Sequence, residues 1–220
     1  LNHILFQRIK LVYVHHSELY GWKKLSFFPK VIVAISDNGV KNLEKYFGVP
    51  MGHIHKIYNC VQDVNPAKHE FRTSNRIKVL YPARINGIKR QLEIVEHLRD
   101  NLCSDIQILF AGIGPQYEDL KGLIRDDKHF VCLGFRTDIY ELLHKCDYMM
   151  LFSHHEGLSI SLIEADMFGT PAICNNVGGN TEIVKDRENG FVVNDWSSLI
   201  RCLNNLTEIK KQEYLSMSHK

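Results

Sequence analysis

Two carboxylates stand eight positions apart in one segment, Glu156 and Glu164 in EGLSISLIE, and Gly157 directly follows the first. The apolar residues after it are spaced as in a helix that begins near Leu158, and such a helix start offers free backbone amides around Gly157 to Ser159 to an anion. Two helical turns would separate the acids by about 10 Å, too far for a pair that acts on one bond. The spacing favours a polar ligand as long as a nucleotide sugar. The alternative, an exposed helix residue at Glu164, fits the apolar run SLIEADMF less well.

Positive side chains cluster in a second segment, YPARINGIKR, where Arg84 directly follows an apolar run and Lys89 precedes the next helix. Arginine offers a bidentate fork and lysine a point charge, so together they could clamp a diphosphate. The alternative is a solvated basic helix start, although the helix dipole disfavours cations there. From this segment alone the two interpretations stay equally open.

Glycine turns and histidines supply weaker signals. AGIGP, with Gly112 and Gly114, follows an apolar run but lacks the GxGxxG spacing of a dinucleotide site, so a plain strand-to-helix turn explains it equally well. The histidine pairs show neither HExxH nor finger spacing, so no metal site is expected. His16 stands apart from them because it follows an apolar strand near the start of the chain.

The bulk composition excludes several classes of protein. Of the 220 residues, 45% are hydrophobic and 24% are charged, which is typical of a globular chain and not of a disordered one. A net charge of +2 gives no basic stripe for nucleic acid, and we expect no nucleic-acid partner. The six scattered cysteines form no CxxC pair, which favours a reduced, cytoplasmic protein, and no apolar run is long enough to span a membrane.

Strands and helices alternate along most of the chain. Short apolar runs such as Val31–Ser36, Ile77–Tyr81 and Ile106–Ala111 are each followed by a glycine turn or cap and a helical pattern. This alternation predicts an α/β fold, a Rossmann-like parallel sheet with helices on both faces and its ligand at the carboxyl ends of the strands. We expect a first domain remnant at 1–61, a linker at 62–74, a second domain at 75–206 and a tail at 207–220. Within the first domain, a helix over 22–28 and a strand over 55–61 are also expected.

The combination of these segments resembles glycosyltransferase family 4, a group of retaining enzymes with the two-domain GT-B fold. Glu156 and Glu164 match its Glu-x7-Glu element, Arg84 and Lys89 its Arg and Lys pair, and AGIGP and LGFRTDI its next two loops. The match covers about 77–193. VHHS, VIVAIS and KIYNCV more loosely resemble the end of its N-terminal domain.

The resemblance implies a metal-independent transfer of sugar from a UDP-, GDP- or ADP-sugar to a glycan or lipid-linked acceptor, with no resident cofactor. It implies that Arg84 and Lys89 neutralise the diphosphate, Glu156 holds sugar hydroxyls, Glu164 holds the ribose, and His16 lies near the sugar. Donor-binding positions are then Arg84, Lys89, Gly112, Gly134, Phe135, Gly157, Leu158, Ser159 and Glu164, with Phe135 near the base.

Some features of the family have no counterpart in this sequence. The glycine-rich loop and acceptor surface of the N-terminal domain are absent, and Cys60 and Ala83 replace common glycines. We therefore keep two alternatives open, a GT-B sugar-nucleotide epimerase or phosphorylase and a non-catalytic nucleotide-binding module. Any peripheral contact with the inner membrane face is expected in the absent part of the first lobe.

Overall fold

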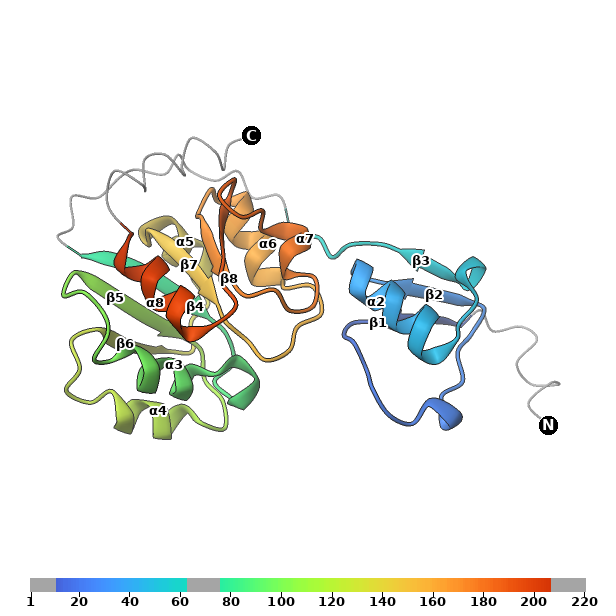
Figure 1. The fold of residues 1–220 in the computed structure, drawn as a ribbon, viewed down its shortest axis with the longest axis horizontal. Helices are drawn as coiled ribbons and strands as arrows, with labels where there is room; N and C mark the ends of the chain where they lie inside the picture. The colour runs from blue at the N-terminus through green and yellow to red at the C-terminus, as the bar shows by residue number, and fades with distance from the viewer. Residues whose placement is uncertain (1–10, 63–75, 207–220) are drawn as a thin grey trace.

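The structure is a computed structural model that describes residues 11–62 and 76–206, which form a smaller and a larger lobe (Figure 1). The expected linker at 62–74, except for Gln62, and the expected tail at 207–220 lie outside the described residues. The smaller lobe contains β1 (Val12–His15), η1 (Lys23–Leu25), β2 (Val31–Ala34), α2 (Asp37–Lys41), η2 (Asn42–Phe47), η3 (Met51–His53) and β3 (Ile54–Lys56).

Three parallel strands in the order β1-β2-β3 form the sheet of the smaller lobe. Its small core is built on Ile32, Ala34 and Leu43, which are fully buried. Helix α2 begins where expected, because the Ser36 hydroxyl accepts a hydrogen bond from the Gly39 amide at 3.0 Å and caps the first turn. The helical path then widens into a π-helical turn, η2, and ends at Gly48.

Six parallel strands form the sheet of the larger lobe, in the order β6-β5-β4-β7-β8-β9. Helices α3, α4 and α8 lie on one face and α5, α6 and α7 on the other (Figure 1). The elements are β4 (Ile77–Pro82), η4 (Gly87–Lys89), α3 (Gln91–Leu98), β5 (Ile106–Ala111), α4 (Tyr117–Leu123), β6 (Phe130–Gly134), α5 (Ile139–Lys145), β7 (Tyr148–Leu151), α6 (Ile160–Met167), β8 (Ala172–Cys174), α7 (Asn180–Ile183), β9 (Gly190–Val192) and α8 (Trp196–Asn204).

The central strands read as continuous apolar runs because helices cover both faces of the sheet. Every residue of β7 is buried, and β4 and β5 are buried at all but one position each. The strand order reverses between β4 and β7: successive strands are added on one side of β4 up to β6 and on its other side from β7, and β4 and β7 pair in parallel. In open parallel sheets, the crevice at this switch point receives the ligand. The loops after β4 and β7, which carry the predicted cations and carboxylates, therefore meet there, and the predicted fold class is confirmed.

Two expected elements of the smaller lobe are shorter than the sequence suggests. In place of a helix over 22–28 there is one 3-10 turn, η1. No residue of η1 is buried and Phe27 is 91% exposed, so a longer helix would have no face to pack. Strand β3 ends at Lys56 because the chain then leaves the sheet toward the larger lobe, where the Asn59 side-chain amide donates to the Leu158 carbonyl at 3.3 Å.

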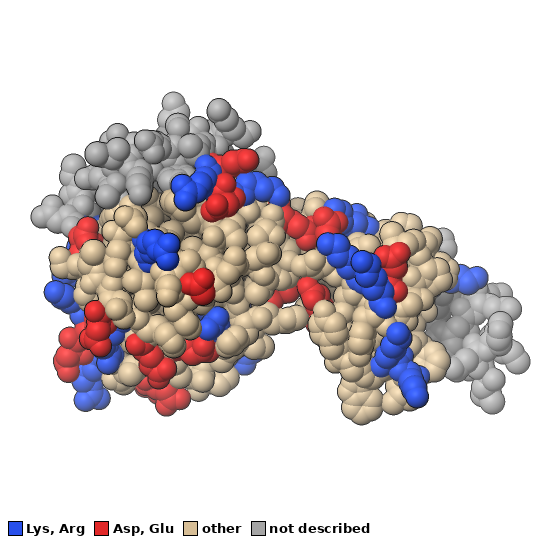
Figure 2. Space-filling view, in the orientation of Figure 1, with Lys and Arg blue, Asp and Glu red and all other residues tan. Residues whose placement is uncertain are grey.

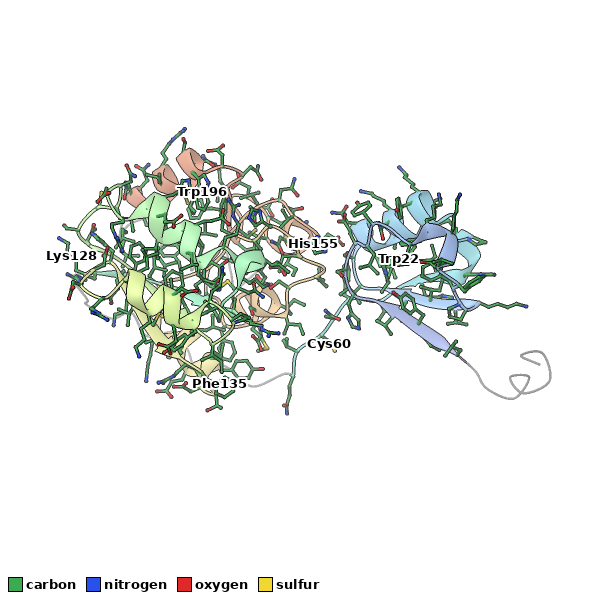
Figure 3. The ribbon with its side chains drawn as sticks, turned by 90° about the horizontal axis from the view of Figure 1, so that it is seen from below. Trp22, Cys60, Lys128, Phe135, His155 and Trp196 are labelled. Carbon is green, nitrogen blue, oxygen red and sulfur yellow. The ribbon has the colours of Figure 1, made fainter. Side chains whose placement is uncertain are left out.

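The lobes meet at the loop after β7 and the glycine turn before α7. The Glu182 carboxylate accepts from the Asp37 backbone amide at 2.8 Å and 3.0 Å, and the Asn38 side-chain amide donates to the Gly178 carbonyl at 2.6 Å. Figure 3 shows His155 on the side of the larger lobe that faces the smaller one. The smaller lobe therefore forms one wall beside the loop that carries Glu156.

Acidic and basic side chains are interspersed over the visible face of the larger lobe (Figure 2), as the near-zero net charge predicts. Within residues 11–62 and 76–206, none of the helices has the length and apolar character needed to cross a membrane. The six cysteines, all in the described ranges, are free thiols.

Candidate donor-binding site

An ion pair joins the two loops that the sequence singled out. Lys89 Nζ lies 2.5 Å from Glu156 Oε1, and only 22% and 9% of the two side chains are exposed. The two residues are distant in sequence but follow the adjacent strands β4 and β7, so sheet topology brings them together. A buried carboxylate without this cation would be strongly unfavourable, and the pair therefore explains how Glu156 is tolerated where it is 8% exposed.

Local hydrogen bonds aim Lys89 toward Glu156. Asn86 caps η4, because its side-chain oxygen accepts from the Lys89 amide at 3.0 Å. Arg90 then adopts a left-handed backbone conformation with φ 60°, which ends the turn and starts α3 in a new direction. The Lys89 side chain consequently points into the crevice, and the next residue points elsewhere.

Arg90 does not join Lys89 as a second phosphate-binding cation. Its guanidinium lies 4.8 Å from the ring centroid of Phe152 and 4.4 Å from that of Trp196, and it forms an ion pair with Glu93 at 3.0 Å. The guanidinium is attracted to the faces of both rings, so Arg90 binds to the protein itself and is not free for a phosphate. Of the cations in this segment, Arg84 and Lys89 therefore remain the candidates for the predicted diphosphate clamp.

A cavity of about 810 Å³ opens on the side of β4, β5 and α6. Of the predicted donor-binding residues, it is lined by Arg84, Gly112, Phe135 and Glu164. Figure 3 shows Phe135 at the opposite edge of the larger lobe from Trp196, so the cavity is separate from the Arg90 cluster. Further lining residues that the sequence did not single out for the site are Ile113, Tyr117, Arg136, Ile139 and Ser161.

The other predicted residues do not line this cavity. Lys89 and Glu156 form their ion pair on the switch-point loops, and His16 is exposed at the lobe boundary. Gly134 lies behind the cavity wall, where its carbonyl accepts from the Gly112 amide at 2.8 Å. The remaining three, Gly157, Leu158 and Ser159, belong to the loop that leads into α6.

Helix α6 begins at Ile160, two residues later than expected, with Ser159 as its N-cap residue. Glu156 therefore precedes the helix by a stretch of loop, and the expected two helical turns between the acids are wrong. Leu158 is 5% exposed and anchors that loop by apolar packing. The helix amides that could receive an anion are those that follow Ser159.

Glu164 is half-buried on α6 within reach of the cavity. Burial raises the pKa of its carboxyl above the ordinary value of 4.5, and a hydrogen bond with Tyr140 acts in the opposite direction. Glu164 lines the cavity and its carboxylate oxygens can accept hydrogen bonds from the hydroxyl groups of a ligand. The alternative of a fully solvated helix residue is therefore wrong.

Two glycines have strict backbone requirements in the site. Gly112 has φ 153°, and a Cβ atom there would overlap the backbone carbonyl of Ala83. At Gly157 a Cβ atom would overlap the backbone carbonyl of His16, which belongs to the smaller lobe. The glycine after Glu156 thus permits close approach of the two lobes, and it places the exposed His16 beside the loop that carries Glu156.

The residues that hold these loops in place carry no signal in the sequence. The Asn175 side chain accepts from the Ser153 amide at 3.1 Å and donates to its carbonyl at 2.7 Å. The Tyr81 hydroxyl contacts both loops, as described below. Both residues sit in or beside buried apolar strands, where the sequence carries no sign of a tertiary hydrogen bond. Within the described ranges, no group of three or more acidic, histidine or cysteine side chains could hold a metal ion.

Comparison with known proteins assigns this geometry to a family. Residues 63–216 match the family model described as glycosyl transferases group 1. The chain is 33% identical over 125 residues to the UDP-Gal:alpha-D-GlcNAc-diphosphoundecaprenol alpha-1,3-galactosyltransferase of Escherichia coli, a match that covers 54% of this chain and 32% of that protein.

A second relative matches a larger share of the chain. The N,N'-diacetylbacillosaminyl-diphospho-undecaprenol alpha-1,3-N-acetylgalactosaminyltransferase of Campylobacter jejuni is 36% identical over 185 residues, 83% of this chain and 46% of that protein. The chain thus spans less than half the length of these relatives. The fold resembles that of Anabaena HepE in complex with UDP-glucose, with a TM-score of 0.81 and 22% identity over 96% of this chain and 66% of that one.

Proposed function

The chain belongs to the glycosyl transferases group 1 family, and from this membership we propose that it is the donor-binding portion of a retaining, metal-independent glycosyltransferase. Its donor is a UDP-, GDP- or ADP-sugar, and its acceptor is a glycan or a lipid-linked sugar. The narrower assignment to family 4 is part of this proposal. The observation that carries it is the placement of the 810 Å³ cavity and the Lys89–Glu156 pair on loops at the same edge of one sheet.

The cavity supports binding of the nucleoside. Its volume lies in the range that small-molecule sites commonly have. Glu164 is placed to accept hydrogen bonds from the ribose, and Phe135, which is 69% exposed at the rim, offers a ring face to the base. Gly112 on the cavity wall permits the close contact with the Ala83 backbone carbonyl that a Cβ atom would prevent.

The loop after β4 supports binding of the diphosphate. Arg84 lies on the cavity wall and Lys89 lies further along the same loop, so the two cations follow one ligand from the nucleoside toward the sugar. Their charge stabilises the leaving diphosphate, together with the amides at the start of α6. Glu156 accepts hydrogen bonds from sugar hydroxyls, and His16 faces the sugar from the smaller lobe.

The test of this function is incubation of the full-length protein with labelled UDP-, GDP- and ADP-sugars and undecaprenyl-diphosphate sugars or oligosaccharides, with and without EDTA. Sugar transfer that survives EDTA and keeps the anomeric configuration supports the proposal. Epimerised donor without transfer indicates the epimerase alternative, and binding without turnover indicates a nucleotide-binding module.

The Arg84 role has its own test. Arg84→Ala in the full-length protein should weaken donor binding about 10- to 150-fold in calorimetry, because a charge-assisted bidentate contact contributes about 1.5–3 kcal/mol. Arg201→Ala, which removes an exposed arginine on α8, is the matched control and should bind like the wild type. Unchanged donor affinity in Arg84→Ala would refute the assigned role.

A further inference from the structure

One buried hydroxyl connects the loop that carries Lys89 to the loop that carries Glu156. The Tyr81 hydroxyl donates to the Lys89 carbonyl at 2.7 Å and accepts from the Phe152 amide at 3.1 Å. Tyr81 stands near the end of β4, next to β7 in the sheet, and its side chain is completely buried. The Tyr81 hydroxyl therefore contacts the backbone of both loops of the switch-point crevice, the one after β4 and the one after β7.

The Tyr81 hydroxyl is a constant donor. Burial raises the pKa of its phenol well above the ordinary value of 10.0, so it keeps its proton throughout the pH range in which proteins work. The ring also packs against Phe110, with centroids 5.8 Å apart. A group with a fixed ring and a fixed proton sets the separation of the two backbones that it joins.

Two other contacts also join the loop that carries Lys89 to the loop that carries Glu156. The His154 amide donates to the Ile88 carbonyl at 2.8 Å, and the Arg90 guanidinium lies over the Phe152 ring. These contacts keep the two loops together when the Tyr81 hydroxyl is removed. The loss of the hydroxyl should therefore alter the alignment of Lys89 with Glu156 without unfolding the lobe.

We propose that Tyr81 is a positioning residue, whose hydroxyl sets the distance between Lys89 and Glu156 and so aligns the diphosphate-binding and sugar-binding groups. The part that concerns the ligand rests on the proposed function. Tyr81 touches no ligand in this proposal and acts through the backbone of Lys89 and Phe152. It adds a specific residue of the strand interior to a site otherwise built from loops.

The first experiment needs no ligand. The coupling between Lys89 and Glu156 is measured by a double-mutant cycle of Lys89→Met and Glu156→Gln in urea, in the wild-type and Tyr81→Phe backgrounds. Tyr81→Phe keeps the buried ring and removes only the oxygen. Tyr148→Phe, which removes a hydroxyl from a buried tyrosine of β7, is the matched control. A coupling that falls with Tyr81→Phe and not with Tyr148→Phe supports the proposal, and an unchanged coupling overturns it.

The second experiment uses whichever nucleotide sugar of the UDP, GDP and ADP series the full-length wild type binds, together with its nucleoside monophosphate. Tyr81→Phe should weaken nucleotide-sugar binding about tenfold, as expected for the loss of one buried hydrogen-bonding group. Binding of the monophosphate should stay unchanged, because Tyr81 does not line the cavity proposed to hold it and its hydroxyl bonds only to the loops of the ion pair. Equal loss for both ligands, or loss for neither, overturns the positioning role. A wild type that binds none of the ligands refutes the proposed function, while the ligand-free cycle still decides the role of Tyr81.

Discussion

The Lys89–Glu156 ion pair predicts unequal costs for the removal of its two partners. Lys89→Met leaves a carboxylate that is 9% exposed without a cation, whereas Glu156→Gln leaves an ammonium that is 22% exposed and can still donate to the amide oxygen. Breaking a fully buried pair costs about 3–5 kcal/mol and an exposed pair at most about 1 kcal/mol. For this intermediate burial we expect about 2–3 kcal/mol for Lys89→Met and about 1 kcal/mol for Glu156→Gln.

Urea unfolding at pH 7 with linear extrapolation measures both free energies of unfolding. The double variant should cost less than the sum of the single variants by about 1–2 kcal/mol, as for residues in direct contact. Because the pair is shielded from water, the coupling should change little between low and high salt.

An exposed ion pair of the same type serves as the control. Lys145 and Glu141 pair one turn apart on α5, with 39% and 55% of their side chains exposed, and Lys145→Met should cost no more than about 0.5 kcal/mol. If Lys89→Met costs as little as this, or less than Glu156→Gln, then the Glu156 carboxylate is solvated in solution and its burial does not set the cost of losing the cation.

Three further perturbations test the cavity, the glycine turn and the lobe contact. The raised pKa of Glu164 means that the folded state holds its proton more tightly than the unfolded chain, so stability is lost as pH rises above the ordinary 4.5. Glu164→Gln should therefore raise Tm at pH 7 and flatten its pH dependence, and a lower Tm would contradict this. Gly112→Ala should lower the free energy of unfolding, measured by urea titration, by about 3 kcal/mol or prevent folding. Gly122→Ala, in open space on α4, should instead raise that free energy by about 0.5–1 kcal/mol. Equal effects of the two substitutions would show that Gly112 is under no special backbone constraint. Glu182→Ala should speed hydrogen exchange of the Asp37 amide and Glu182→Gln should do so less, because it keeps an acceptor oxygen; unchanged exchange in both would show that the lobe contact is absent in solution.

Much of the larger lobe is predictable from local patterns. Short, β-branched apolar runs such as Ile106–Ala111 favour buried strands, and glycines after several of them, such as Gly112 and Gly134, allow the turn that returns the chain as a helix. The edge of the sheet that carries Arg84 and Glu164 follows from this alternation alone, because parallel strands all end on one side. The placement of both residues at one cavity is the consequence.

The rest of the site depends on contacts that no local pattern encodes. The pairing of Lys89 with Glu156 requires β4 and β7 to be neighbours, and the sequence does not state which strands adjoin. The start of α6 is shifted to Ile160 because Gly157 must lie against the smaller lobe, a tertiary requirement that overrides the apolar periodicity. In the sequence, Tyr81 is one residue in an apolar strand. Only the fold places the Lys89 carbonyl and the Phe152 amide within hydrogen-bonding distance of its hydroxyl.

The ion pair also constrains how a donor can bind. A diphosphate that takes Lys89 removes the only cation paired with Glu156 among the described residues, and it leaves a carboxylate that is 8% exposed. An intact nucleotide sugar avoids this cost because its sugar hydroxyls donate to Glu156 at the same time. The full-length protein should therefore bind the nucleotide sugar more tightly than the nucleoside diphosphate, by more than ordinary hydroxyl contacts give, and Glu156→Gln should reduce that difference because the amide has no charge to leave unpaired. Calorimetry with both ligands measures this difference in affinity. Equal affinities in the wild type would show that water solvates the Glu156 carboxylate when Lys89 binds the diphosphate.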